Sequence, residues 1–155
     1  MKYAIEVELR RLFKAESSLD NVQALFIGEP NFVQLHHFPM IIIFTEQRLV
    51  FDEETGIWVY RYLGYVAAET FIQDDYEVKD REMDVTSLLT LRSILDSVTD
   101  VMEDNQSLGN LLEGNEKVRE IQVGDKNYGR RERDNNHFNR GEVNFIVESQ
   151  KPRSS

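Results

Sequence analysis

The sequence predicts an α+β fold: a two-layer domain in which two main helices cover one face of an antiparallel or mixed sheet of about five strands. Two observations support this fold class. Apolar residues recur with helical spacing in two segments, near the N-terminus and between Leu88 and Met102, whereas other segments show strand-like alternation or short β-branched runs. The two helical segments are separated by several strands, which differs from the regular strand–helix alternation of a parallel sheet.

The N-terminal segment is predicted to be a helix because its apolar residues form one stripe. These residues are Ile5, Leu9, Leu12 and Phe13. A short strand, Ala24 to Ile27, follows and is ended by Gly28 and Pro30.

The middle of the chain predicts a buried strand and a long hairpin. The continuous β-branched run from Met40 to Phe44, which contains Ile42, is typical of a strand buried on both faces. The segments 48–51 and 57–72 then form the two arms of a hairpin, with turn residues between Asp52 and Gly56. Because the second arm is long, Gly64 is expected to mark a bulge or bend.

The last third of the chain predicts the second helix and two closing strands. The helix stripe consists of Leu88, Leu91, Leu95, Val98 and Met102. The segments 117–124 and 141–149 alternate as half-buried strands, and the residues between them form the loop of a long protruding hairpin. One domain, residues 1–149, and a flexible tail, 150–155, are expected. The expected core includes Leu9, Phe13, Ile42, Leu88, Leu95, Val98, Val143 and Phe145.

The charge distribution argues against a nucleic-acid-binding protein. The chain has 18 basic and 28 acidic residues, a net charge of −10. One stretch, residues 125–140, is basic and contains Lys126, Arg130, Arg131, Arg133 and Arg140. Non-specific binding to DNA requires many neutralised phosphates, which so acidic a body does not supply.

The composition also indicates a soluble cytoplasmic product. With 41% hydrophobic residues the chain can form a core, and without cysteine it has no disulfide framework or thiolate metal site. The longest apolar run, "FPMIIIF", is too short to span a bilayer, and the N-terminus lacks a signal core. We therefore expect no membrane partner.

No motif predicts an active site. His36, His37 and His137 lack the spacing of zinc ligands, and adjacent residues of an extended segment point to opposite sides. The acidic residues between 74 and 84 lack the spacing of a calcium loop and are expected to be a solvated charge run. No nucleophile elbow or phosphate-binding glycine loop is present. We expect no enzyme activity, no metal and no cofactor.

The ordered set of elements resembles a known family. The segments that carry the resemblance are the helix "ELRRLFKA", the strand and turn "VQALFIGEP", the proline-led strand "FPMIIIF", the long strand "YLGYVAAETFI" before the leucine-rich helix, and the closing "IQVGDKNYG" and "FNRGEVNFIVE". Together they are similar to the tail terminator (tail completion, tail-to-head joining) proteins of long-tailed bacteriophages. The match covers nearly the whole chain.

The resemblance implies a structural virion protein that forms a ring, usually a hexamer, on the finished tail tube. Such a ring stops tube polymerisation and offers a docking surface for the head connector, while DNA only passes through its lumen. The implied partners are further copies of the chain, the tail tube protein, the head connector or stopper protein, and a sheath protein in tails that carry one. The implied location is the tail–head junction of the virion, with assembly in the host cytoplasm.

Within this scheme, the basic stretch is predicted to be an interface. Arg130, Arg131 and Arg133 are expected to contact an acidic patch of a neighbouring subunit or partner, and the turn residues Asp52, Glu53 and Glu54 are candidates for such a patch. A flexible, solvated hairpin tip is the alternative for this stretch. For the whole protein, a small acidic inhibitor that mimics DNA is the second hypothesis, and a metal-dependent nuclease is the third.

Overall fold

A computed structural model describes the chain except residues 53–55, 73–80, 134–135 and 154–155, and gives only the backbone of Asp52 and of residues 81–86. Two helices and six strands form in the order α1 (Lys2–Ala15), β1 (Ala24–Ile27), β2 (Met40–Asp52), β3 (Ile57–Ile72), α2 (Arg81–Asp104), β4 (Leu112–Glu113), β5 (Glu116–Arg133) and β6 (Asn136–Pro152), with short 3₁₀ turns at Ser17–Leu19 and Leu35–His37.

The strands form one mixed sheet in the order β1-β2-β3-β6-β5-β4. Strand β1 is parallel to β2, and the other neighbours are antiparallel. The predicted α+β class is therefore confirmed, but the described sheet has six strands and not five. The additional strand is β4, which lies between two glycines with positive φ, Gly109 and Gly114. These glycines let the chain reverse on both sides of a two-residue strand.

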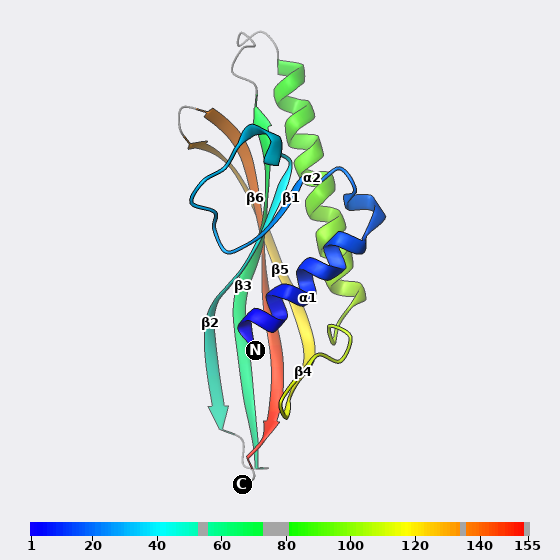
Figure 1. Ribbon diagram of the computed structural model, residues 1–155, viewed down its shortest axis with the longest axis vertical. Coiled ribbons are helices and arrows are strands. Elements are labelled where there is room, and N and C mark those ends of the chain that lie inside the picture. The colour runs from blue at the N-terminus through cyan, green and yellow to red at the C-terminus, as the bar shows by residue number, and fades with distance from the viewer. Residues whose placement is uncertain (53–55, 73–80, 134–135, 154–155) are drawn as a thin grey trace.

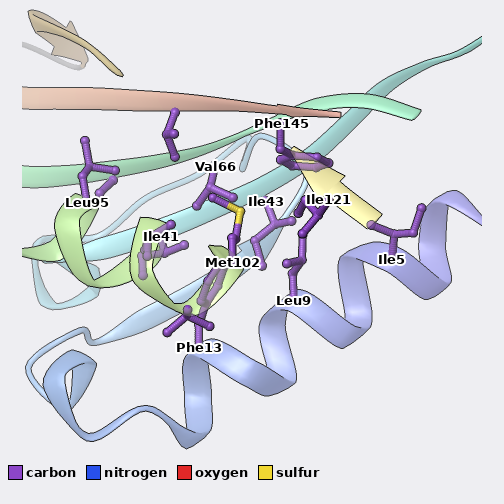
Figure 2. Packing of buried hydrophobic residues seen from close by; sticks show 14 of the residues in the cluster. Ile5, Leu9, Phe13, Ile41, Ile43, Val66, Leu95, Met102, Ile121 and Phe145 are labelled. Carbon is purple, nitrogen blue, oxygen red and sulfur yellow. The ribbon is translucent and has the colours of Figure 1, made fainter. Parts of the chain in front are cut away.

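Both helices pack on one face of the sheet, and this is where the main core lies (Figure 2). Helix α1 contributes Ile5, Leu9 and Phe13, which face the side chains of Ile41 and Ile43 on β2. Helix α2 and the central strands complete the cluster with Leu91, Leu95, Val98, Met102, Val66, Val143, Phe145 and Val147. Leu88 is partly buried at the margin of this cluster. The cluster contains the other core residues that the sequence predicts, except Ile42: Leu9, Phe13, Leu95, Val98, Val143 and Phe145.

Strand β2 is buried on both faces where it enters the sheet, as the β-branched run predicts. Ile41 and Ile43 face the helices, so the alternating side chain of Ile42, also fully buried, belongs to the opposite face. The segment 28–39 passes over this opposite face. Phe38 packs against Phe71 and Phe138, with ring centroids 5.8 and 6.0 Å apart. Part of the sheet therefore has cover on both sides.

The two strands predicted at 40–44 and 48–51 are one continuous strand with a bulge. The register with β3 shifts between Thr45 and Gln47, opposite Gly64, so Glu46 is the additional residue. Next to the bulge, the backbone N–H of Thr45 donates to the buried carboxylate of Glu6 on α1 at 2.9 Å. Because the carboxylate is buried, the pKa of Glu6 is raised, although the bond from Thr45 partly offsets this.

The prediction that residues 125–140 are a loop is wrong. Strands β5 and β6 form an antiparallel ladder that continues to the pair Arg133 and Asn136, so the basic residues lie in strands. The register between β5 and β6 shifts twice, between Val118 and Glu120 and between Val123 and Lys126, and the pairing continues beyond both shifts. Strand β6 also continues past residue 149 to Pro152, and the N–H of Arg153 donates to the carbonyl of Gly56 at 2.9 Å.

The sheet is long and strongly twisted, and its two ends differ (Figure 1). The end of β2, the beginning of β3 and the C-terminal end of β6 lie together at one end of the long axis. The end of β5 and the beginning of β6 lie toward the other end of the long axis, which is also the end where α2 begins.

Candidate interface surfaces

Basic residues of the 125–140 stretch are paired with carboxylates of the same chain. The Nζ of Lys126 lies 2.6 Å from Asp96 of α2. A guanidinium nitrogen of Arg133 lies 3.1 Å from Glu69, whose side chain is fully buried. Much of the positive charge that the sequence assigns to a partner is therefore neutralised within the subunit.

The most extensive of these contacts is an ion cluster around Arg140, whose side chain is only 7% exposed. Its Nη1 donates to Glu69 at 2.7 Å and its Nε donates to Glu142 at 2.9 Å. Its Nη2 donates to Glu29, which follows β1 in the chain. With Arg133, these residues form what we call the Arg140 cluster. It ties the segment after β1 to the middle of the sheet.

The electrostatics of the Arg140 cluster favour the charged forms. Burial by itself would lower the pKa of Arg140, but the hydrogen bonds that Arg140 donates to Glu29 and Glu69 outweigh this effect and the pKa is raised. Burial would likewise raise the pKa of Glu29, but Arg140 and Tyr65 donate to its carboxylate and the pKa is lowered. For Tyr65, burial and the bond to Glu29 both raise the pKa. The cluster is a set of mutually neutralising charges.

Arg130, Arg131 and Arg133 do not form one patch. Adjacent strand residues point to opposite faces, so Arg130 lies on the face opposite to Arg131 and Arg133. Arg133 is 31% exposed, stacks on Phe138 at 4.9 Å and pairs with Glu69. Arg131 is 60% exposed and lies 3.9 Å from Glu142. Arg130 is exposed. The interface role of Arg130 and Arg131 stays a prediction, whereas the geometry of Arg133 indicates an intramolecular contact.

The acidic candidates lie at the other end of the molecule. Asp52 is the last residue of β2 and pairs with Trp58, toward the end where the C-terminus lies (Figure 1). Glu53 and Glu54 lie outside the described residues. Asp52 and Arg130 of one subunit are thus at different ends of the long axis.

The Arg140 cluster was not predicted, although the sequence contains a signal for it. Glu69 stands inside the apolar run "YVAAETFI", and a carboxylate in such a strand needs a cation. The cross-strand pairing of Glu69 with Arg140 supplies it. Treating Arg140 as part of a loop concealed this pairing.

A second surface lies on the part of the β2–β3 hairpin that extends beyond β1. Strand β1 pairs with β2 only from Met40 to Ile43, and no described strand pairs with the outer edge of β2 beyond that point. We call Glu46–Asp52 and Ile57–Leu63 the arm. Val50 and Phe51, at 49% and 41% exposure, are exposed on it.

Arginines cover the aromatic side chains of the arm. Arg48 lies 5.1 Å from the ring of Tyr60, and Arg61 lies 4.9 Å from the ring of Phe51. From the end of the chain, Arg153 lies 4.4 Å from the ring of Trp58. Aromatic residues and arginine are enriched at protein interfaces and among the residues that contribute most to binding. The arm therefore has the composition of an interface.

An open groove of about 560 Å³ lies between the arm and the start of α1. Its lining includes Lys2, Tyr3, Glu46, Gln47, Arg48 and Tyr62. The hydroxyl of Tyr62 donates to Glu116 at 2.6 Å, and burial together with this carboxylate raises the pKa of Tyr62. The hydroxyl of Tyr62 therefore stays protonated. The groups that the groove offers to a partner include the cations Lys2 and Arg48 and the exposed ring of Tyr3.

His36 and His37 lie in the 3₁₀ turn Leu35–His37 with ring centroids 4.3 Å apart, and not in the extended segment that the sequence predicts. The ring of His37 packs edge-on against Phe26 at 5.5 Å, and its Nδ1 accepts from the backbone N–H of Gln34 at 3.0 Å. No group of three or more histidine, aspartate or glutamate side chains with metal-binding geometry occurs among the residues that the structure describes. The acidic residues between 74 and 80 lie outside that part of the chain.

Among the described residues, no helix has both the length and the apolar character needed to cross a membrane.

Comparison with known proteins identifies the fold. No family model and no curated protein matches the sequence. Among solved structures, the chain is similar to one from the virion of a native gene transfer agent particle, with a TM-score of 0.65 and 11% identity over 96% of both chains. Another solved structure has a TM-score of 0.40 and 15% identity, over 94% of this chain and 91% of that one. The first likeness shows that this fold occurs, over its full length, in a virion component.

Proposed function

We propose that this protein is a structural component of a phage or phage-like virion and acts as a tail terminator. In this role it forms a ring, expected to be a hexamer, on the end of the tail tube. The ring stops tube polymerisation and provides the surface to which the head connector or stopper docks. The observation that carries the proposal is the full-length similarity of fold to a gene transfer agent virion chain, at 96% coverage of both chains.

The surfaces of the chain support assembly. The arm presents exposed apolar residues and stacked arginines next to a strand edge with which no described strand pairs. An exposed edge of this kind invites contact with another chain unless a partner covers it. Assembly would provide that cover.

The charge of the chain supports a role in which DNA passes without being held. A ring of subunits with a net charge of −10 each repels phosphate at short range, and so disfavours a static complex with DNA. In the same proposal, Arg130 and Arg131 contact a protein partner such as the connector, the tube or the sheath, and Asp52, Glu53 and Glu54 offer a complementary patch. The protein acts through these contacts and requires no catalysis, metal or cofactor.

The mass of the purified protein and its effect on tube growth test the proposal. We expect a ring of several subunits by native mass spectrometry, and a central opening in negative-stain images. When added to polymerising tube protein from the same particle, it should bind tube ends and stop elongation. A bovine serum albumin control should leave elongation unchanged. A strictly monomeric protein that leaves tube growth unchanged would contradict the proposed function.

A further inference from the structure

We propose that the groove beside the arm is one half of the subunit interface and that it receives an acidic stripe on α2 of a second copy of this chain. This inference rests on the proposed ring and specifies which surfaces form it.

The acidic stripe consists of four carboxylates on one face of α2. Asp96, Asp100, Glu103 and Asp104 recur at intervals that place them on the same side of a helix. Asp96 is 66% exposed even though Lys126 contacts it. The side chains of Asp100, Glu103 and Asp104 are exposed, and none has an ion-pair partner among the described residues. Lys126 compensates only part of this charge, through its ion pair with Asp96 and its electrostatic interaction with Asp100, so the stripe keeps a net negative charge.

The lining of the groove is net positive, because it holds the two cations Lys2 and Arg48 and the single carboxylate of Glu46. Arg48 is exposed and stacks on Tyr60, and within the described residues no carboxylate pairs with it. Lys2 donates to the backbone carbonyl of Glu46 at 3.3 Å, and the buried carboxylate of Glu6 balances part of its charge. Tyr3, 67% exposed, adds an aromatic face beside these cations. The groove therefore suits a helix face that presents carboxylates.

The positions of the two surfaces suit a ring. A ring is built from heterologous contacts, in which two different patches of one subunit each meet the complementary patch of a neighbour. The arm side of β2 and the C-terminal half of α2 lie on opposite sides of the molecule (Figure 1). One subunit can therefore offer its groove to one neighbour and its stripe to the next.

A second copy is favoured as the occupant because both halves of the contact occur on the same chain. The apolar residues of the arm, Val50 and Phe51, extend the contact beyond the charges. Charge complementarity sets the register of such a contact, and the aromatic and apolar groups add affinity.

A charge-swap experiment tests this interface. One variant carries Arg48→Glu, and the other carries Asp100→Arg together with Glu103→Arg. We expect each variant alone to form rings at least about tenfold more weakly than the wild type at low salt. In an equimolar mixture each groove meets a stripe of opposite charge, so the mixture should recover rings. Arg119→Glu, at an exposed position of β5 outside the residues assigned to both surfaces, is the control and should assemble as the wild type does. Circular dichroism verifies that each variant is folded.

Cross-linking provides an independent test, because the chain has no cysteine of its own. Gln47→Cys lies in the groove and Asp100→Cys lies in the stripe. Under mild oxidation, the mixture of the two variants should yield a disulfide-linked dimer that neither variant forms alone. A dimer formed by Gln47→Cys alone would show an isologous contact between β2 edges and would overturn the proposal.

The outcomes separate this inference from the proposed function. If the wild type forms rings but the variants assemble normally and no mixed disulfide appears, the interface assignment is wrong while the ring proposal stands. If the wild type neither forms rings nor arrests tube growth, the proposed function itself fails.

Discussion

Arg140 holds together carboxylates from three separate parts of the chain. Glu29 follows β1, Glu69 lies on β3 and Glu142 lies on β6. Burying these charges carries a desolvation penalty, which the mutual pairing offsets. The cluster therefore adds little to stability compared with an apolar substitute, but it penalises any arrangement in which one member is missing.

Removing the cation should expose this penalty. We predict that Arg140→Ala lowers the free energy of unfolding by about 3–5 kcal/mol, because Glu69 is left buried with reduced compensation. Urea denaturation measures the change. Arg119→Ala, at an exposed position without a carboxylate partner among the described residues, should change it by less than about 0.5 kcal/mol. The double variant Arg140→Met with Glu69→Gln should recover part of the loss. Equal stability of Arg140→Ala and wild type would show that the cluster does not form.

Glu29 should make a component of the stability depend on pH. Its pKa in the folded chain is lowered from the ordinary value of 4.5. Its contribution is therefore complete above pH 4.5 and is lost as the pH falls through the lowered pKa. We predict that Glu29→Gln is less stable than the wild type at pH 7, and that the difference shrinks below pH 4.5. Urea denaturation at several pH values checks this. A difference that stays constant with pH would contradict it.

At the scale of elements, the bulge in β2 is accommodated by Gly64. A Cβ added to Gly64 would lie 2.3 Å from the carbonyl oxygen of Phe44 and 2.6 Å from the Cζ of Phe145. The glycine lets the ring of Phe145 and the bulged strand approach the β3 backbone closely. This close approach shapes the strand from which the arm extends.

A methyl group at this position should therefore be destabilising. We predict that Gly64→Ala lowers the free energy of unfolding by about 1–3 kcal/mol, as overpacking does. Gly129→Ala is the matched control, because a Cβ at Gly129 in β5 has no neighbour within 4 Å. That control should be neutral or slightly stabilising. Thermal and urea denaturation of both variants measure the effect, and a neutral Gly64→Ala would show that β2 and β6 can move apart.

The sequence predicted the bounds of an element best where a residue such as glycine terminates it. Strand β1 ends at Ile27 as expected, because Gly28 adopts a positive φ. The stripe of α1 predicted the burial of Ile5, Leu9 and Phe13, whereas Leu12 is only partly buried. The burial of Glu6, which accepts from the N–H of Thr45, was not predicted. The lengths of β5 and β6 were underestimated because their charged residues are matched across the sheet, and such pairing does not appear in the sequence of either strand alone. For the same reason the Arg140 cluster was missed.

At the scale of the whole molecule, the chain has a net charge of −10, yet strands β5 and β6 carry a group of basic side chains. The ion pairs of Lys126 and Arg133 reduce the charge available to a partner, whereas Arg130 and Arg131 are exposed. Substituting these two arginines therefore tests whether this end of the molecule binds a protein or DNA.

Reversing the two arginines should impair joining and not DNA affinity. We predict that Arg130→Glu with Arg131→Glu weakens tail-to-head joining in a salt-dependent manner, because charge complementarity at an interface is screened by salt. Retention on a DNA column at physiological ionic strength should be the same as for the wild type. In vitro joining assays and column elution measure the two properties. Normal joining, combined with DNA retention by the wild type alone, would identify the arginines as a nucleic-acid contact.

The placement of the C-terminal strand has a practical consequence for microscopy. Arg153 is hydrogen-bonded to Gly56, so the chain leaves the sheet at the end of the long axis where β2 and β3 also meet. A small gold-binding tag fused after Ser155 would mark that end of the subunit. If the long axis runs along the tail, the tag would mark one rim of the assembly and reveal its polarity, whereas a subunit lying flat would place the label around the circumference.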